Sequence, residues 1–236
     1  MKKDLVEISK DLLKNVSELD DIIDSYFDPI TDITDTAKDI FTPIKIVHSL
    51  YTYNKKRKFK SFLKSYAKSL EEGGIDTPEK TRRLYSYLEK RKNFNFINDT
   101  IESAINSKSI YGSMLLGYFA GKVFSQTLNI TLKELITLEA LKELNDYELS
   151  YFTKIYSVAD LSKTINVNDY KKELGNTFLY EITISRLIQL RMVEEAPILA
   201  SGKPKGSFIA SEISEDIYFM IQDMGIEKEL IDYGLQ

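Results

Sequence analysis

Cysteine and tryptophan are absent from this 236-residue chain, and histidine occurs once, at position 48. Without cysteine there are no disulfide bonds, no thiolate zinc sites and no cysteine nucleophiles. A single histidine cannot form a metal site alone, and no Gly-x-Ser-x-Gly sequence indicates a serine hydrolase. We therefore predict a protein with no catalytic site, no metal and no cofactor. The lack of cysteine and of a signal-peptide pattern favours a cytoplasmic location.

Glycine and proline are scarce, at 10 and 5 residues, and long apolar runs are missing. A many-stranded sandwich or barrel needs denser turns, so we expect a mainly helical fold. The stretch 110–124 is nearly uncharged but shorter than the roughly 20 residues that a membrane-spanning helix needs. Gly117 and Gly121 have the spacing that lets two helices approach closely. We predict a buried core helix here, and a membrane-associated effector only as a weaker alternative.

Three short sequences resemble ligand sites but lack essential parts. Asp20, Asp21 and Asp24 match the DDxxD pattern of prenyl-diphosphate enzymes, without a second acidic cluster at the required spacing. The aspartates of segment 28–35 lack the glycine and the closing glutamate of an EF-hand. The loop 201–207 contains glycines and lysines but not the spacing of a phosphate-binding P-loop. Solvated helix faces and turn chemistry explain these sequences better.

Apolar residues recur three and four positions apart through most of the chain, which predicts a series of helices. Breaks at Pro29, Pro43 and Gly73-Gly74 divide the N-terminal part, and Thr131 with Glu134 forms a capping box. The predicted helices cover 5–27, 36–70 with a kink or break near Pro43, 79–92, 95–106, 109–127, 131–144, 147–158, 176–192 and a last one from about Ser214. The inward face of the second helix comprises Phe59, Phe62, Leu63, Tyr66 and Leu70.

Two short extended runs, 193–198 and 207–211, flank a loop of glycine, proline and lysine, which predicts a β-hairpin. A helix, a hairpin and a helix after earlier helices is the layout of a winged-helix unit. We therefore expect an all-α fold with a C-terminal winged-helix-like β-hairpin. The predicted parts are an N-terminal helical region, 1–128, and a winged-helix-like C-terminal unit, 129–236.

The net charge of −4 is unevenly distributed. Segment 55–92 carries 13 basic and 5 acidic side chains, a net of +8, between segments 1–54 at −5 and 93–236 at −7. Lysines four apart lie on one ridge of a helix, and arginines follow on the next helix. These candidate binding residues are Lys56, Lys60, Lys64, Lys68, Arg82 and Arg83. They predict a docking surface for an acidic protein or for phosphates, or a face covered by the acidic first helix.

Nucleic-acid binding by the C-terminal unit is an alternative. The candidate contacts are Arg186 and Arg191 near the helix before the hairpin, and Lys203 and Lys205 in its loop. The neighbouring Glu194 and Glu195, and the net charge of −7, disfavour a polyanion. The sequence thus favours a non-enzymatic interaction or regulatory protein that binds a protein partner through charged helical surfaces.

Three stretches of the chain form a pattern: the basic stretch Lys55-Lys-Arg-Lys-Phe-Lys-Ser-Phe-Leu63, the helical segment 135–144, and the helix, hairpin and helix of segment 179–221. In these stretches the chain resembles the Abi-alpha abortive-infection family of bacterial phage-resistance proteins. The first is similar to the basic stretch after the N-terminal helices of that family, the second to the helix that opens its C-terminal unit, and the third to its final helix, hairpin and helix. The usual glycine-rich entry is replaced by Phe41-Thr-Pro-Ile-Lys45. The resemblance implies a link to phage defence or a prophage, and it supplies no catalytic residues.

Overall fold

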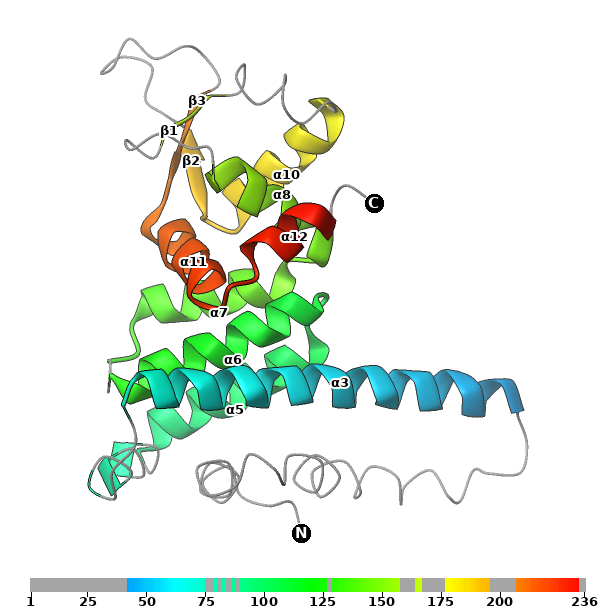
Figure 1. Cartoon of the computed structure of the whole chain (residues 1–236), viewed down its shortest axis with the longest axis vertical. Coiled ribbons are helices and arrows are strands. Elements are labelled where there is room, and N and C mark those ends of the chain that lie inside the picture. Colours follow the sequence, from blue (N-terminus) through cyan, green and yellow to red (C-terminus); the bar gives the residue numbers. More distant parts are fainter. Residues whose placement is uncertain are drawn as a thin grey trace. The chain divides into compact units, whose positions relative to one another are not determined.

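The structure is a computed structural model of the chain, and its two parts are described separately (Figure 1). It describes residues 42–74, 79, 82–83, 86–87, 90–126, 129–157, 164–166, 177–195 and 207–233. The chain divides into two compact units, Met1–Ile130 and Thr131–Gln236. The division expected from the sequence, between residues 128 and 129, lies two residues earlier.

In the residues that the structure describes, the first unit contains the long helices α3 (Thr42–Glu72), α5 (Arg91–Asn106) and α6 (Ile110–Ser125). Within the described residues α3 is continuous from Thr42, and the residues before the kink or break expected near Pro43 lie outside them. Pro43 stands in the first turn, where its missing N–H is not needed. The helix ends at Glu72, and in the turn after it Gly74 has a φ of 70° and donates its N–H to the Glu71 carbonyl at 2.8 Å.

Aromatic side chains fill the core of the first unit. The predicted inward face of α3 is confirmed, because Phe59, Phe62, Leu63, Tyr66 and Leu70 are at most 2% exposed. The rings of Phe59, Phe62 and Tyr66 stack along the helix at centroid distances of 6.4 and 6.0 Å. Phe124 of α6 meets the ring of Tyr66 edge-on at 6.3 Å, which joins the two helices.

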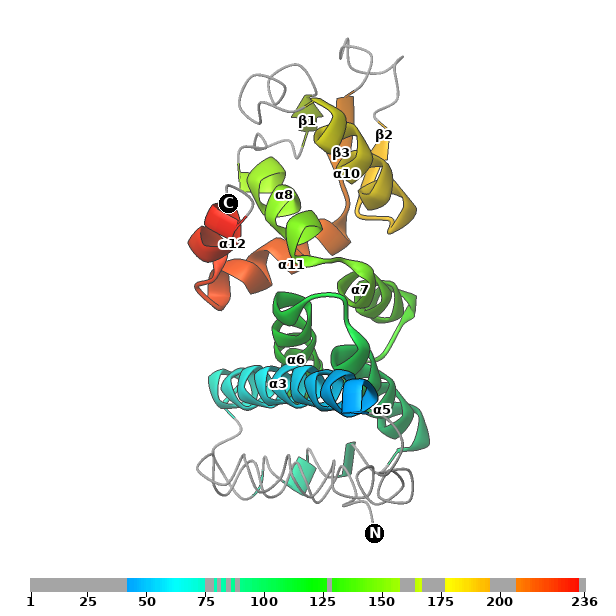
Figure 2. The same cartoon turned by 90° about the vertical axis from the view of Figure 1, so that its right-hand side faces the viewer.

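Helix α6 packs closely against α3 through glycine (Figure 2). A Cβ atom added at Gly117 would stand 2.1 Å from the carbonyl oxygen of Phe62. One added at Gly121 would stand 2.6 Å from the Cβ of Ser69. The expected buried core helix is therefore confirmed, and its glycines bring two helices of the same unit together. In the part of the chain that the structure describes, no helix is both long and apolar enough to cross a membrane.

The second unit contains α7 (Leu132–Glu143), α8 (Asp146–Ser157), α10 (Thr177–Gln189), α11 (Glu212–Asp223) and α12 (Glu227–Tyr233). The capping box of α7 is confirmed: the Thr131 N–H donates to Glu134 Oε2 at 2.7 Å, and Thr131 Oγ1 accepts from Lys133. Helix α11 begins before Ser214, because Ser211 caps it. It is not the last helix, since Gly225 ends it with a φ of 71° and α12 comes after it.

A small antiparallel sheet completes the second unit. The strands are β1 (Thr164–Asn166), β2 (Val193–Glu195) and β3 (Ser207–Ala210), in the order β1-β3-β2. In the β2–β3 pair Val193 lies opposite Ala210, and β1 pairs with the other edge of β3, with Thr164 opposite Ile209. The predicted hairpin in a mostly helical fold is confirmed, whereas β1 was not predicted.

Two serines fix the turn between α10 and β2. The Oγ atom of Ser214 donates to the Met192 carbonyl at 2.5 Å, and Ser211 Oγ donates to the Arg191 carbonyl at 2.9 Å. Both serines belong to the start of α11, so they tie this helix to the end of α10. The backbone of Arg191 is therefore held by α11 as well as by α10.

Candidate functional site

The predicted basic ridge lies along α3. Lys56 and Lys60 are half-buried, whereas Lys64 and Lys68 are exposed. Lys68 Nζ lies 3.6 Å from a carboxylate oxygen of Glu72 and 6.0 Å from the centroid of the Tyr118 ring. The C-terminal end of the ridge is thus partly compensated within the first unit, and such an exposed pair contributes little stability.

Other basic side chains of segment 55–92 have different surroundings. Arg82 and Arg83 are exposed, and Arg83 pairs with Glu79 at 3.1 Å. Lys58 donates to the Ser107 carbonyl, and Lys92 donates to the Ile130 carbonyl at 2.5 Å. Lys58 and Lys92 therefore connect separate segments of the first unit. The net charge of segment 55–92 counts Lys58 and Lys92 together with the ridge lysines, although their side chains have these structural contacts.

The proposed nucleic-acid contacts are not brought together as a basic surface. Arg186 points to acidic neighbours, with guanidinium nitrogens 3.1 Å from Glu143 and 3.6 Å from Glu148, and its side chain is 27% exposed. Arg191 is exposed at the end of α10. Lys203 and Lys205 lie outside the described residues. An arginine that pairs with two glutamates is poorly available for phosphates.

The sequences considered as metal sites remain without structural support. Asp20, Asp21, Asp24 and segment 28–35 lie outside the described residues, as does the side chain of His48. Among the residues that are described, no group of three or more His, Asp or Glu side chains is placed to hold a metal ion.

Exposed apolar side chains concentrate on the second unit, a feature that the sequence reasoning missed. In the described part of the chain eight large hydrophobic side chains are exposed, and seven belong to this unit. They are Leu132, Leu135, Tyr147, Phe178, Ile182, Ile188 and Phe219. The eighth is Tyr53 of α3.

Helices α7 and α10 carry five of these seven side chains. On α7, Leu132 and Leu135 are 66% and 49% exposed, whereas Leu141 on the opposite face is fully buried. On α10, Phe178 and Ile182 are 69% and 49% exposed. A helix that is apolar on both faces is normally buried on both. The leucines all around segment 131–144 were thus the signal in the sequence that one apolar face of this helix could be exposed.

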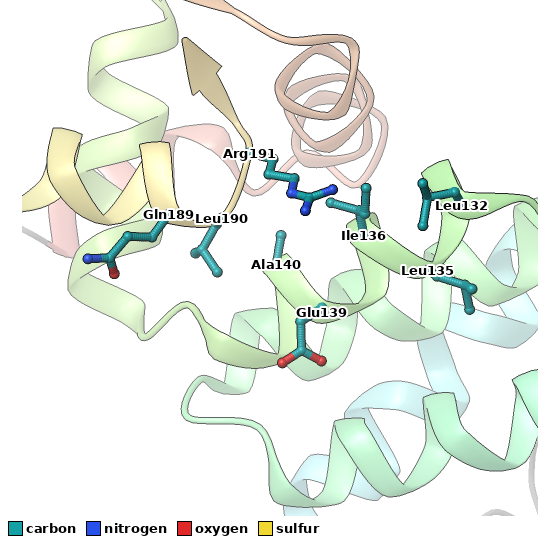
Figure 3. A pocket seen from close by; sticks show the side chains of 8 residues that line it. All are labelled: Leu132, Leu135, Ile136, Glu139, Ala140, Gln189, Leu190 and Arg191. Carbon is teal, nitrogen blue, oxygen red and sulfur yellow. The ribbon is translucent and has the colours of Figure 1, made fainter. Parts of the chain in front are cut away.

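A pocket of about 320 Å³ lies between α7 and the end of α10 (Figure 3). Apolar side chains form most of its wall, and the guanidinium of Arg191 extends toward Ile136 in Figure 3. The lining residues are Leu132, Leu135, Ile136, Glu139, Ala140, Gln189, Leu190 and Arg191.

Two further hollows adjoin this pocket through shared lining residues. A hollow of about 450 Å³ shares Leu132, Ile136 and Arg191 with it and extends to β3 and α11. Another, of about 350 Å³, shares Gln189 and runs along α10 as far as Phe178. The residues that line these three hollows together form what we call the α7/α10 surface.

The α7/α10 surface is acidic overall. It contains five glutamates, at 139, 148, 181, 194 and 212, against three basic residues, Lys133, Arg186 and Arg191. Lys133 Nζ lies 2.8 Å from Asp216 and 3.5 Å from Glu212. The hydrogen bond to Asp216 raises the pKa of Lys133, so this charge persists at neutral pH but is compensated. A polyanion is repelled by such a surface.

Comparisons with protein-family models, with curated proteins and with solved structures found no match for this chain. The resemblance to the abortive-infection family, and the link to phage defence that it implies, therefore stay predictions based on the three stretches within 55–63, 135–144 and 179–221.

Proposed function

We propose that this chain is a non-enzymatic protein-binding module whose partner docks on the α7/α10 surface. The observation that carries the proposal is the position of four exposed apolar side chains that line adjoining hollows: Leu132 and Leu135 in the 320 Å³ pocket, and Phe178 and Ile182 in the hollow along α10. Contiguous exposed apolar side chains with a polar rim are typical of protein interaction sites.

The second unit serves in this proposal as a winged helix. Helix α10 directly precedes the β2–β3 hairpin, so it takes the place of the recognition helix, and the hairpin takes the place of the wing. The third strand, β1, supports this assignment because it anchors the hairpin to the segment before α10.

Protein contact explains α10 better than contact with base edges does. A recognition helix for DNA presents arginine, lysine or amide side chains to the groove. The exposed positions of α10 include Phe178, Glu181 and Ile182, and its Arg186 pairs with Glu143 and Glu148. An apolar and acidic helix face suits a protein partner.

Selection of binding peptides tests the proposal without knowledge of the natural partner. A random peptide library is panned on the full chain, and enriched peptides are measured against Leu135→Asp and Ile182→Asp. Both positions are about half exposed, so an aspartate should lower stability by only about 0.5 kcal/mol. We expect the peptides to lose at least about tenfold in affinity for both variants, because a charge replaces an apolar contact.

Tyr53→Asp provides the matched control, since Tyr53 is 64% exposed but belongs to the first unit. It should bind the peptides as the unchanged protein does. Thermal unfolding of each variant verifies that the fold is intact. The proposal is wrong if no peptide is enriched, or if the enriched peptides bind Leu135→Asp and Ile182→Asp at full strength.

A further inference from the structure

Arg191 has a backbone conformation that normally belongs to glycine. Its φ is 59°. Among the described residues, Arg191 is the one residue other than glycine that has a positive φ. Its N–H donates to the Ile188 carbonyl at 2.9 Å, and the Met192 N–H donates to the Leu187 carbonyl at 2.9 Å. This pair of bonds is a Schellman motif, with Arg191 at the left-handed position after α10.

The same motif ends α11 with the expected residue. There the Gly225 N–H donates to Gln222 at 2.9 Å, the Ile226 N–H donates to Ile221 at 3.2 Å, and the φ of Gly225 is 71°. A residue with a Cβ atom is less stable than glycine in this conformation. An arginine at such a position is unfavourable for folding, and residues of this kind cluster at binding sites.

The side chain of Arg191 brings a positive charge to an apolar pocket. In the part of the chain that the structure describes, its guanidinium makes no hydrogen bond or ion pair. It borders both the 320 Å³ pocket and the 450 Å³ hollow, beside Leu132 and Ile136. The carboxylate in the first pocket, Glu139, lies 3.5 Å from Lys142 and is already compensated.

We propose that the α7/α10 surface binds an amphipathic protein segment that places an apolar side chain in the pocket and a neighbouring carboxylate on Arg191. This inference rests on the proposed function and specifies the chemistry of the partner. The planar guanidinium binds a carboxylate by donating two parallel hydrogen bonds to it. The leucine and isoleucine wall provides the site for the apolar anchor.

The surroundings of Arg191 favour a single carboxylate over a phosphate chain. Glu194 lines the 450 Å³ hollow with Arg191, and glutamates outnumber basic residues on the α7/α10 surface, which disfavours a partner that carries many negative charges. One carboxylate can still form a local pair with the arginine. The hollows extend along α10 and toward β3, so the site is longer than a small acid requires.

Paired peptides test this inference. Each peptide enriched by panning on the full chain is synthesised with its acidic residue and again with Asn or Gln in that position. We expect enriched peptides to carry Asp or Glu beside a large apolar residue, and the amide version to bind about tenfold more weakly. Arg191→Gly should weaken the acidic peptide to the same degree and leave the amide peptide unchanged.

Three variants separate the outcomes. Arg191→Gly should melt no lower than the unchanged chain, because glycine relieves the left-handed backbone, so lost binding is not lost fold. Arg191→Lys keeps the charge and should retain part of the preference for the acidic peptide. Lys228→Gln removes one charge from α12, away from the lining residues, and should change nothing.

The carboxylate inference is overturned if both peptides of a pair bind equally and Arg191→Gly has no effect. In that case Leu135→Asp still abolishes binding if the proposed function is correct. If Leu135→Asp also has no effect, the proposed function fails together with the inference.

Discussion

The two units of this protein differ in how far they bury their large apolar side chains. In the first unit Gly117 and Gly121 let α6 approach the backbone of α3. Among the described residues of this unit, Tyr53 is the one large hydrophobic side chain that is exposed. In the second unit α7 and α10 bury one face and leave apolar side chains open on another. The charges differ as well, since residues 1–130 carry 21 basic and 18 acidic side chains, and residues 131–236 carry 11 and 18.

The first unit uses its apolar side chains for internal packing, whereas the second unit leaves an apolar face exposed. A charged surface over a closed core remains compatible with solvent, whereas an open apolar face gains free energy when a partner covers it. We therefore expect substitutions inside the first unit to affect stability most. On the α7/α10 surface of the second unit we expect effects on binding with little effect on stability.

Gly117→Ala should have the largest effect, a loss of roughly 4 kcal/mol in the free energy of unfolding. Alanine gains about 1 kcal/mol of helix propensity over glycine, but its Cβ would stand 2.1 Å from the Phe62 carbonyl oxygen. The clash is with the backbone, which cannot move aside cheaply. Urea denaturation followed by circular dichroism measures the change.

Gly225→Ala is the matched control in the second unit. Nothing lies within 4 Å of the added Cβ, so the cost comes only from the φ of 71° and should be about 1 kcal/mol. Equal losses for the two variants would show that α6 and α3 have room for a methyl group at Gly117.

Leu141→Ala should destabilise by roughly 3 kcal/mol, whereas Leu135→Ala should stay within about 0.5 kcal/mol. Both leucines belong to α7, but Leu141 is fully buried and Leu135 is 49% exposed. The pair therefore compares the two faces of one helix by urea denaturation. A large loss for Leu135→Ala would mean that this face is part of the core and is closed to a partner.

Alkaline pH should destabilise the second unit through Tyr218. Burial raises the pKa of Tyr218, and its hydrogen bond to Glu227 at 2.5 Å raises that pKa further. Below pH 10 the phenol is neutral in both states and the stabilisation is complete. Above pH 10 the unfolded state loses the proton first, so stability falls by about 1.4 kcal/mol per pH unit until the folded pKa is reached.

Tyr218→Phe isolates that contribution from those of the other tyrosines. The variant should be less stable than the unchanged chain at pH 8, and its melting temperature should fall less between pH 10 and pH 11. Parallel pH profiles of the two proteins would exclude Tyr218 as the cause.

Reversal of the basic ridge should have the smallest effect on stability. In the variant with the exposed Lys64 and Lys68 changed to Glu, we expect a change of only a few tenths of a kcal/mol, because exposed ion pairs contribute little. If the ridge is itself a docking surface, this variant loses a bound partner but keeps its melting temperature. A marked drop in melting temperature would show that the ridge is structural and is covered by acidic residues of the same chain.

Periodicity in the sequence predicted much of the fold. Phe62 and Tyr66 were assigned correctly to the inward face of α3, and the Thr131–Glu134 capping box and the β2–β3 hairpin are confirmed. Strand β1 was missed because three residues, Thr164–Asn166, are too short for an alternating pattern. Helix α12 was missed because Gly225 marks the end of α11 without indicating that a second, short helix begins beyond it.

The candidate site was harder to predict than the fold. Apolar periodicity identifies which residues share a helix face, but not whether another element covers that face. Leu135 and Leu141 have similar sequence surroundings and opposite exposures. The left-handed backbone conformation of Arg191 could not be predicted from the sequence either, because the residue expected in that conformation after the end of a helix is glycine. Net charge also counts Lys58 with the other basic residues of segment 55–92, although Lys58 donates to the Ser107 carbonyl inside the first unit.

Methyl NMR of the full chain with one peptide selected by panning tests the central claim most directly. The account predicts that the peptide shifts the methyl resonances of Leu132, Leu135, Ile136 and Ile182, and leaves those of Leu70 and Leu115 in the first unit in place. Shifts confined to the first unit, or distributed evenly over both, would contradict a docking site on the α7/α10 surface.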